Sequence, residues 1–227
     1  MAETTTPGSS APNNSEAATR ATEESAFYHE AALNAAWTGS RLAIGALSFL
    51  FGAFAFAYFY LFSSNGHGMW LPSSTRIPSN HYGETITGLI VVSAIIQTAG
   101  LQLIKRGNKA AWFNAAIVSL AFGLVAVSLQ VVELLNLPFQ PGQSGFASVF
   151  VGFYPVALVT WLSAMIWLEI MVMRSRHIPP ISFVEQPPTY VEAFEVQRFQ
   201  SALSAFTVVW NYLAIVTFIF WLLFYVR

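Results

Sequence analysis

Five long apolar stretches, separated by polar segments, dominate the hydrophobic pattern of the chain. The first, LAIGALSFLFGAFAFAYFYLF, carries no charged residue, and as a helix it would reach about 31 Å, the thickness of the hydrocarbon core of a bilayer. The stretches lie at about 42–62, 85–104, 112–135, 146–173 and 199–225. We therefore predict an all-α fold, a polytopic membrane protein built as a bundle of five transmembrane helices.

The composition agrees with this class of protein. Hydrophobic residues make up 55% of the 227 residues and charged residues only 9%, too few charges to cover a soluble domain of this size. Cysteine is absent, which excludes disulfides, thiolate metal sites and cysteine nucleophiles. The net charge of −1 gives no sign of a nucleic-acid partner, and we expect none.

The chain divides into a tail and a membrane domain. Residues 1–26 are rich in Thr, Ser, Ala, Glu and Asn and contain no apolar core of the kind a signal peptide needs. A segment of this composition buries too little apolar surface to offset its ordering entropy. We expect 1–26 to be a disordered cytoplasmic tail and 27–227 to form the transmembrane bundle.

Basic residues are divided unevenly between the two ends of the predicted spans. Eight lie in the N-terminal segment and in the loops around 105–109 and 174–198, and only Arg76 and Arg227 lie on the other side. The eight are Arg20, Arg41, Lys105, Arg106, Lys109, Arg174, Arg176 and Arg198. Because Lys and Arg concentrate in cytoplasmic loops, we expect a cytoplasmic N-terminus and an external C-terminus.

Two polar residues of the third span share one helix face. Gln130 and Glu133 are three positions apart, and residues at this spacing are neighbours on a helix. Glu133 lies toward the external end of its span. We hypothesise that it is a structural anchor, held together with Gln130 by hydrogen bonds within the bundle, rather than a proton carrier.

Three further polar residues of the spans are candidates for structural or lipid-facing positions. Gln97 either hydrogen-bonds between helices or lines a polar path. Glu169 lies about one turn before Arg174, where it can extend toward the membrane surface or pair with a basic residue. Asn211 is the most polar residue at mid-depth in the last span.

Catalytic chemistry is not visible in the spans. The four histidines, His29, His67, His81 and His177, all lie outside them, and haem ligation inside a membrane needs facing His or Met side chains. No nucleotide-binding or metal motif is present. These residues indicate an accessory subunit that binds no cofactor of its own.

Several segments follow one another in an order known from one family. The first span ends in AFAYFYL and is followed by MWLPSS, a basic turn reads IKRGNKAAW, and the third span ends in LQVVELLNLPF. The last two spans read GQSGFASVFVGFYPVALVTWLSAMIWL and AFTVVWNYLAIVTFIFWLLFYV. With these segments the membrane part, roughly Arg41 to Arg227, resembles subunit III of the haem–copper oxidases, the cytochrome c oxidase family, in its short five-helix bacterial form.

The resemblance implies a function through a complex. A subunit III is non-catalytic and cofactor-free, packs beside oxidase subunits I and II, which hold the haem and copper, and binds phospholipid between its helices. The complex reduces oxygen with electrons from cytochrome c and couples this to proton translocation in aerobic respiration. The resemblance also implies the bacterial cell membrane as the location.

Individual positions match the family unevenly. Gln130 and Glu133 match its Gln-x-x-Glu motif. Leu47 stands where the family often has a membrane-embedded glutamate, and Tyr154 and Ala157 stand near two family histidines. Two alternatives stay open at this point. One is a subunit III-like protein of a nitric oxide reductase system, and the other is a small membrane transporter using Glu133 and Glu169.

Overall fold

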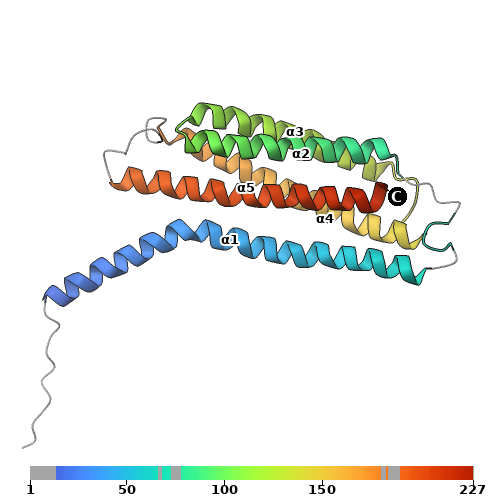
Figure 1. Ribbon diagram of the computed structural model, residues 1–227, viewed down its shortest axis with the longest axis horizontal. Helices are drawn as coiled ribbons and strands as arrows, with labels where there is room; N and C mark the ends of the chain where they lie inside the picture. The colour runs from blue at the N-terminus through green and yellow to red at the C-terminus, as the bar shows by residue number, and fades with distance from the viewer. Residues whose placement is uncertain (1–13, 66–67, 73–77, 180–182, 184–189, 227) are drawn as a thin grey trace, which may run out of the picture.

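The structure is a computed structural model that describes residues 14–65, 68–72, 78–179, 183 and 190–226. Five long helices form one bundle in this part of the chain, which contains no strand (Figure 1). The helices are α1 (Asn14–Ser64), α2 (Asn80–Lys105), α3 (Lys109–Leu135), α4 (Gly145–Arg176) and α5 (Tyr190–Tyr225). All five are long and apolar enough to cross a membrane, so the predicted all-α, multi-pass fold is confirmed, and each predicted span falls inside one helix.

Helix α1 begins earlier than the composition of the tail predicts. Residues 14–26, which were expected to be disordered, form its first turns, and the helix continues without a break into the predicted first span. This segment is rich in Ala and Glu, which are strong helix formers, so it can be helical without packing against a core. Its side chains from Ala18 to Ala26 are exposed. Residues 1–13 lie outside the described residues.

Helices α2 and α3 form a close antiparallel pair. A turn of three residues joins them, with Gly107 at a positive φ of 85°, a conformation that glycine adopts without steric cost. The buried hydroxyl groups of Ser93 and Ser119 lie 2.8 Å apart, and each also donates to the backbone carbonyl of the other residue. Small residues at such contacts let two helix backbones approach closely in a membrane.

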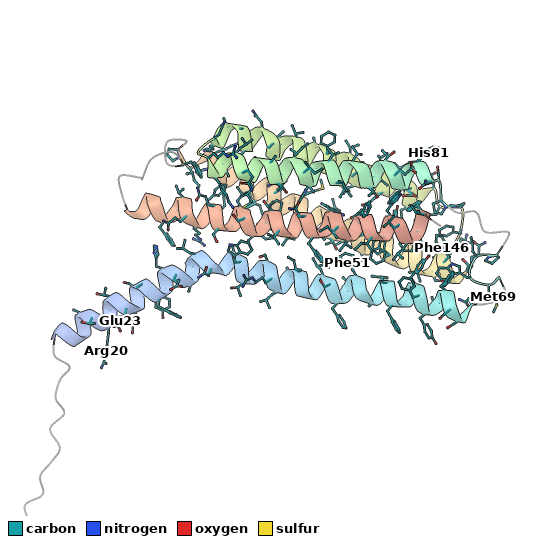
Figure 2. All side chains as sticks on the ribbon, in the orientation of Figure 1. Arg20, Glu23, Phe51, Met69, His81 and Phe146 are labelled. Atoms are coloured by element: carbon teal, nitrogen blue, oxygen red, sulfur yellow. The ribbon has the colours of Figure 1, made fainter. Side chains whose placement is uncertain are left out.

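Helix α1 packs against α4 and α5 along one stripe. Phe51 points from α1 into the bundle, where its ring lies 5.9 Å from Phe153 and 6.2 Å from Phe220 (Figure 2). Tyr58 of α1 donates to the backbone carbonyl of Leu223 at 2.8 Å. The opposite side of α1 stays uncovered, and only 11% of its most apolar window is buried, against 33–44% in the other four helices.

The two ends of the bundle differ in charge. The start of α1, the α2–α3 turn, the end of α4 and the start of α5 lie at the same end (Figure 1). Arg20 and Glu23 lie on the part of α1 that projects beyond this end, and Met69 and His81 lie at the opposite end (Figure 2). At the basic end, the ammonium group of Lys109 donates to the carbonyl of Ile178, which fixes the start of α3 to the segment after α4.

The close contact between α2 and α3 makes a testable prediction at Gly100. A Cβ atom there would lie 2.9 Å from the Cβ atom of Ala115 on α3. We expect Gly100→Ala to lower the free energy of unfolding by about 1–3 kcal/mol, because the two helices must move apart. Gly88, on the same helix, has no atom within 4 Å of such a Cβ, and Gly88→Ala is the matched control. Detergent-titrated unfolding followed by circular dichroism measures both, and equal effects would contradict the close-contact explanation.

Candidate functional site

Glu133 lies buried near the end of α3 and binds side chains from two other helices. Tyr225 of α5 donates its phenol hydrogen to Glu133 Oε1 at 2.6 Å, and Tyr154 of α4 donates to Glu133 Oε2. The two phenol oxygens lie 2.7 Å apart. The carboxyl group and the two phenols therefore form a closed cycle of three contacts, here named the Glu133 ring, and this cycle joins α3, α4 and α5.

The surrounding residues hold the two phenols in place. Phe150, one turn before Tyr154 on α4, stacks on its ring with centroids 4.4 Å apart. Gly83 of α2 lies against the ring of Tyr225, and a Cβ atom at this position would come within 2.9 Å of three carbons of that ring. The absence of a side chain at Gly83 thus provides the space for Tyr225, so α2 contributes to the site by its shape.

A count of protons defines the charge of the Glu133 ring. Three contacts between three groups need three hydrogens to be hydrogen bonds, and the two phenols supply two. A protonated carboxyl group on Glu133 supplies the third hydrogen, in which case one of the two phenols accepts from Glu133 and donates to the other phenol. In this arrangement each group donates once, and no uncompensated anion is buried in an apolar setting, where it would be very costly. No cationic side chain among the described residues pairs with Glu133.

The partner position Gln130 also lies buried on α3, with 3% of its surface exposed. It faces the same side as Glu133, as their spacing predicts, and it lines a small cavity beside Tyr154 and Tyr225. Its Oε1 atom has no hydrogen-bond partner among the described residues. Gln130 is therefore beside the Glu133 ring without being a member of it.

The other three candidates from the sequence lie in separate places. Gln97 of α2 is completely buried, and neither polar atom of its amide has a partner among the described residues. Asn211 of α5 binds Thr98 of α2 through its side-chain nitrogen at 3.0 Å. Glu169 is exposed on α4. It lies 15 residues, or about 22 Å of helix, from Tyr154, so it does not share a site with Glu133.

Some polar contacts of the bundle were not identified from the sequence. Tyr225 follows Glu133 by 92 residues, and no local pattern links them. Trp210 of α5 donates to Ser93 at 3.2 Å and so joins the serine pair between α2 and α3. A signal for both contacts exists in retrospect, because Tyr and Trp carry a polar atom that usually finds a partner when buried.

A groove between α2 and α5 opens on the side of the bundle, with a volume of about 750 Å³. Its walls are mostly apolar, with Val91, Ile95, Ile215 and Phe218 among them. The hydrogen-bonded pair of Thr98 and Asn211 forms its polar spot. Apart from this spot, few polar groups line the groove.

Metal-binding residues do not gather anywhere in the part of the chain that the structure describes, where no group of three or more His, Asp or Glu side chains could hold an ion. The buried polar residues of the bundle are instead hydroxyl, amide and indole groups together with the carboxyl group of Glu133. In comparisons with known proteins, no family model and no curated protein matches the chain.

The Glu133 ring predicts different results for two substitutions at this position. Glutamine carries both a donor and an acceptor, so Glu133→Gln keeps three hydrogen bonds and should change the free energy of unfolding by less than about 1 kcal/mol. Glu133→Leu leaves one phenol donating to the other and one buried hydroxyl unpaired. It should lower stability by about 1–3 kcal/mol.

Unfolding of the purified full chain in mixed detergent micelles measures these differences. Glu169→Leu is the control, since this carboxylate is exposed and its loss should change stability little. If Glu133→Gln were as destabilising as Glu133→Leu, the ring would need an ionised carboxylate, and the neutral ring would be wrong.

Proposed function

We propose that this chain is a non-catalytic, cofactor-free subunit III of a haem–copper oxidase of the cytochrome c oxidase family. The observation that supports the proposal most is where the three residues of the Glu133 ring lie in the sequence. Its three members come from three segments on which the resemblance rests, LQVVELLNLPF, the span that begins GQSGF, and the last span. Three segments that are remote in sequence and that carry the resemblance thus meet at one point of the fold.

The position of Tyr154 supports the same proposal. Near this place the resembling family has a histidine, and here the phenol donates to the glutamate of the Gln-x-x-Glu motif. The residue type differs at this place, but in this chain it still supplies a hydrogen-bond donor. On this proposal the contact is structural, and it holds the external ends of three helices together.

The catalytic work belongs to partner subunits in this proposal. Haem and copper reside in subunits I and II, where electrons from cytochrome c reduce oxygen and protons are translocated. The uncovered face of α1, which exposes Phe49 and Phe56 at 83% and 71%, is the surface of this chain that offers most room for membrane partners. Apolar exposure of this kind in a bilayer suits either lipid or another transmembrane helix.

A bound phospholipid fits the groove between α2 and α5. Gln102 lines the groove. The exposed Lys105 follows it by three residues on the same face of α2, and the exposed Arg106 comes directly after the end of the helix. An acyl chain would lie in the groove, and an anionic headgroup would lie near the two basic side chains.

The alternative of a small transporter has less support in the geometry. A transport path with two carboxylates needs them near each other or linked by polar groups. Glu133 is closed within its ring, and Glu169 is exposed about 22 Å away along α4. The nitric oxide reductase alternative predicts a different reaction in the copurified complex, and activity measurements separate the two.

Orientation and location complete the proposal. The basic end of the bundle, with Lys105, Lys109 and Arg176, is proposed to face the cytoplasm of a bacterium, because Lys and Arg concentrate on that side. The projecting start of α1 is then cytoplasmic, and the Glu133 ring lies toward the external face of the cell membrane.

Copurification tests the proposed function. The tagged chain, isolated in mild detergent from its native membranes, should bring with it haem-containing subunits that consume oxygen with reduced cytochrome c. The chain produced alone should show no haem absorption and no ion flux in liposomes. Recovery without any haem protein, or nitric oxide reduction in place of oxygen reduction, would refute the oxidase assignment. A tagged membrane protein of similar size is the control for carry-over.

The orientation can be tested by labelling because the chain contains no cysteine. Ser25→Cys places a thiol on the exposed start of α1, and Ser63→Cys places one near its other end. In intact cells a membrane-impermeant maleimide should label Ser63→Cys alone, and Ser25→Cys should react only after the membrane is opened. The reverse pattern would show that the orientation is inverted.

A further inference from the structure

A small cavity adjoins the Glu133 ring inside the bundle. Its volume is about 20 Å³, which is enough for one water molecule but not for an organic ligand. Gly83 and Thr87 of α2 line one side, and Tyr154 of α4 lines another. The other polar residues of the wall are Gln130 of α3 and Thr217, Trp221 and Tyr225 of α5. The cavity therefore lies where four of the five helices meet.

Two of the lining residues carry polar atoms that lack partners. Gln130 Oε1 is an acceptor and Trp221 Nε1 is a donor, and each is buried without a hydrogen bond to any described residue. A buried polar atom left in this state costs about 1–3 kcal/mol, and bilayer lipid cannot replace the missing bond. An unpaired acceptor and an unpaired donor thus belong to residues that line the same water-sized cavity, and a single bound molecule could satisfy both.

We propose that this cavity is a binding site for a single structural water molecule. The water accepts a hydrogen bond from Trp221 Nε1 and donates one to Gln130 Oε1. Its second hydrogen goes to a phenol oxygen of the Glu133 ring, because each phenol there donates once and accepts once and so keeps a free lone pair. Three hydrogen bonds are typical of a buried water, and both unpaired atoms are satisfied.

The water extends the Glu133 ring into a larger network. Gln130 adds a second residue of α3 to it, and Trp221 adds a second residue of α5, one turn before Tyr225. The site makes Gln130 and Glu133 parts of one hydrogen-bonded unit, although the two side chains do not bind each other. This water site does not depend on the chain being an oxidase subunit.

A double-mutant cycle on the full chain tests the shared water. Gln130→Leu and Trp221→Phe each remove one partner of the water, and we expect each to lower the folding equilibrium constant. Once one partner is lost the water is poorly held, so the second substitution should do less harm. The double variant should therefore be more stable, by about five-fold or more in that constant, than the product of the single effects predicts.

Trp70 provides the matched control. Its indole nitrogen is also buried without a partner, but Trp70 does not line the cavity. Gln130→Leu combined with Trp70→Phe should therefore give effects that multiply. Gln130→Met, which preserves the length of the side chain, replaces Gln130→Leu in both cycles if the leucine variant does not fold.

A structure that resolves ordered water gives the direct readout on the wild-type chain. One density peak should lie within hydrogen-bond distance of Gln130 Oε1 and Trp221 Nε1, and it should be missing in the double variant. The proposal stands if the peak is present and if the effects of Gln130→Leu and Trp221→Phe on stability depend on each other. A cavity without a peak, or effects that multiply in that cycle as they do with Trp70, overturns it.

Discussion

A carboxyl group inside a bilayer needs hydrogen-bond partners from the protein, because lipid supplies none. In this chain the partners of Glu133 are phenols on two other helices, and much of the bundle is arranged so that these three groups meet. Gly83 leaves room for the ring of Tyr225, and Phe150 stacks on Tyr154. The hydrogen bonds of this polar site thus hold α3, α4 and α5 together. Inside a bilayer, apolar side chains have no hydrophobic driving force to leave lipid for a neighbouring helix, so such bonds add to the stability that packing provides.

The fold was predictable from hydropathy because a membrane span is a matter of length and of the absence of charge. The stretch 42–62 and its four successors all became parts of helices. The start of α1 is not predictable from hydropathy, since the low hydrophobicity of residues 14–26 is typical of disordered segments. Helix propensity acts without burial in this Ala- and Glu-rich segment. A helix can therefore extend well beyond the apolar residues that reveal it in the sequence.

Only the part of the candidate site that lies on α3 was predictable from the sequence. The spacing of Gln130 and Glu133 placed both on one buried face, because three positions is nearly one turn. Their partners follow from tertiary packing, which spacing within a span does not encode, and so Tyr225 and Trp221 were missed. Gln97 shows the opposite case. Its amide was a reasonable choice for a contact between helices, but the serine and threonine beside it, Ser93 and Thr98, make the bonds that link α2 to its neighbours.

The placement of α1 has a consequence for how the chain is made. Helices α2 and α3 are neighbours in sequence and can pair as soon as the ribosome has produced them. The partners of α1 come much later, since Ser48 binds Tyr212 across 164 residues. At a synthesis rate of about 5–20 residues per second, this delay is roughly 8 to 33 s. During that interval α1 is a newly inserted helix with none of its α5 partners yet made. The face of α1 that later packs against α5 must therefore also be stable in lipid until α5 is made.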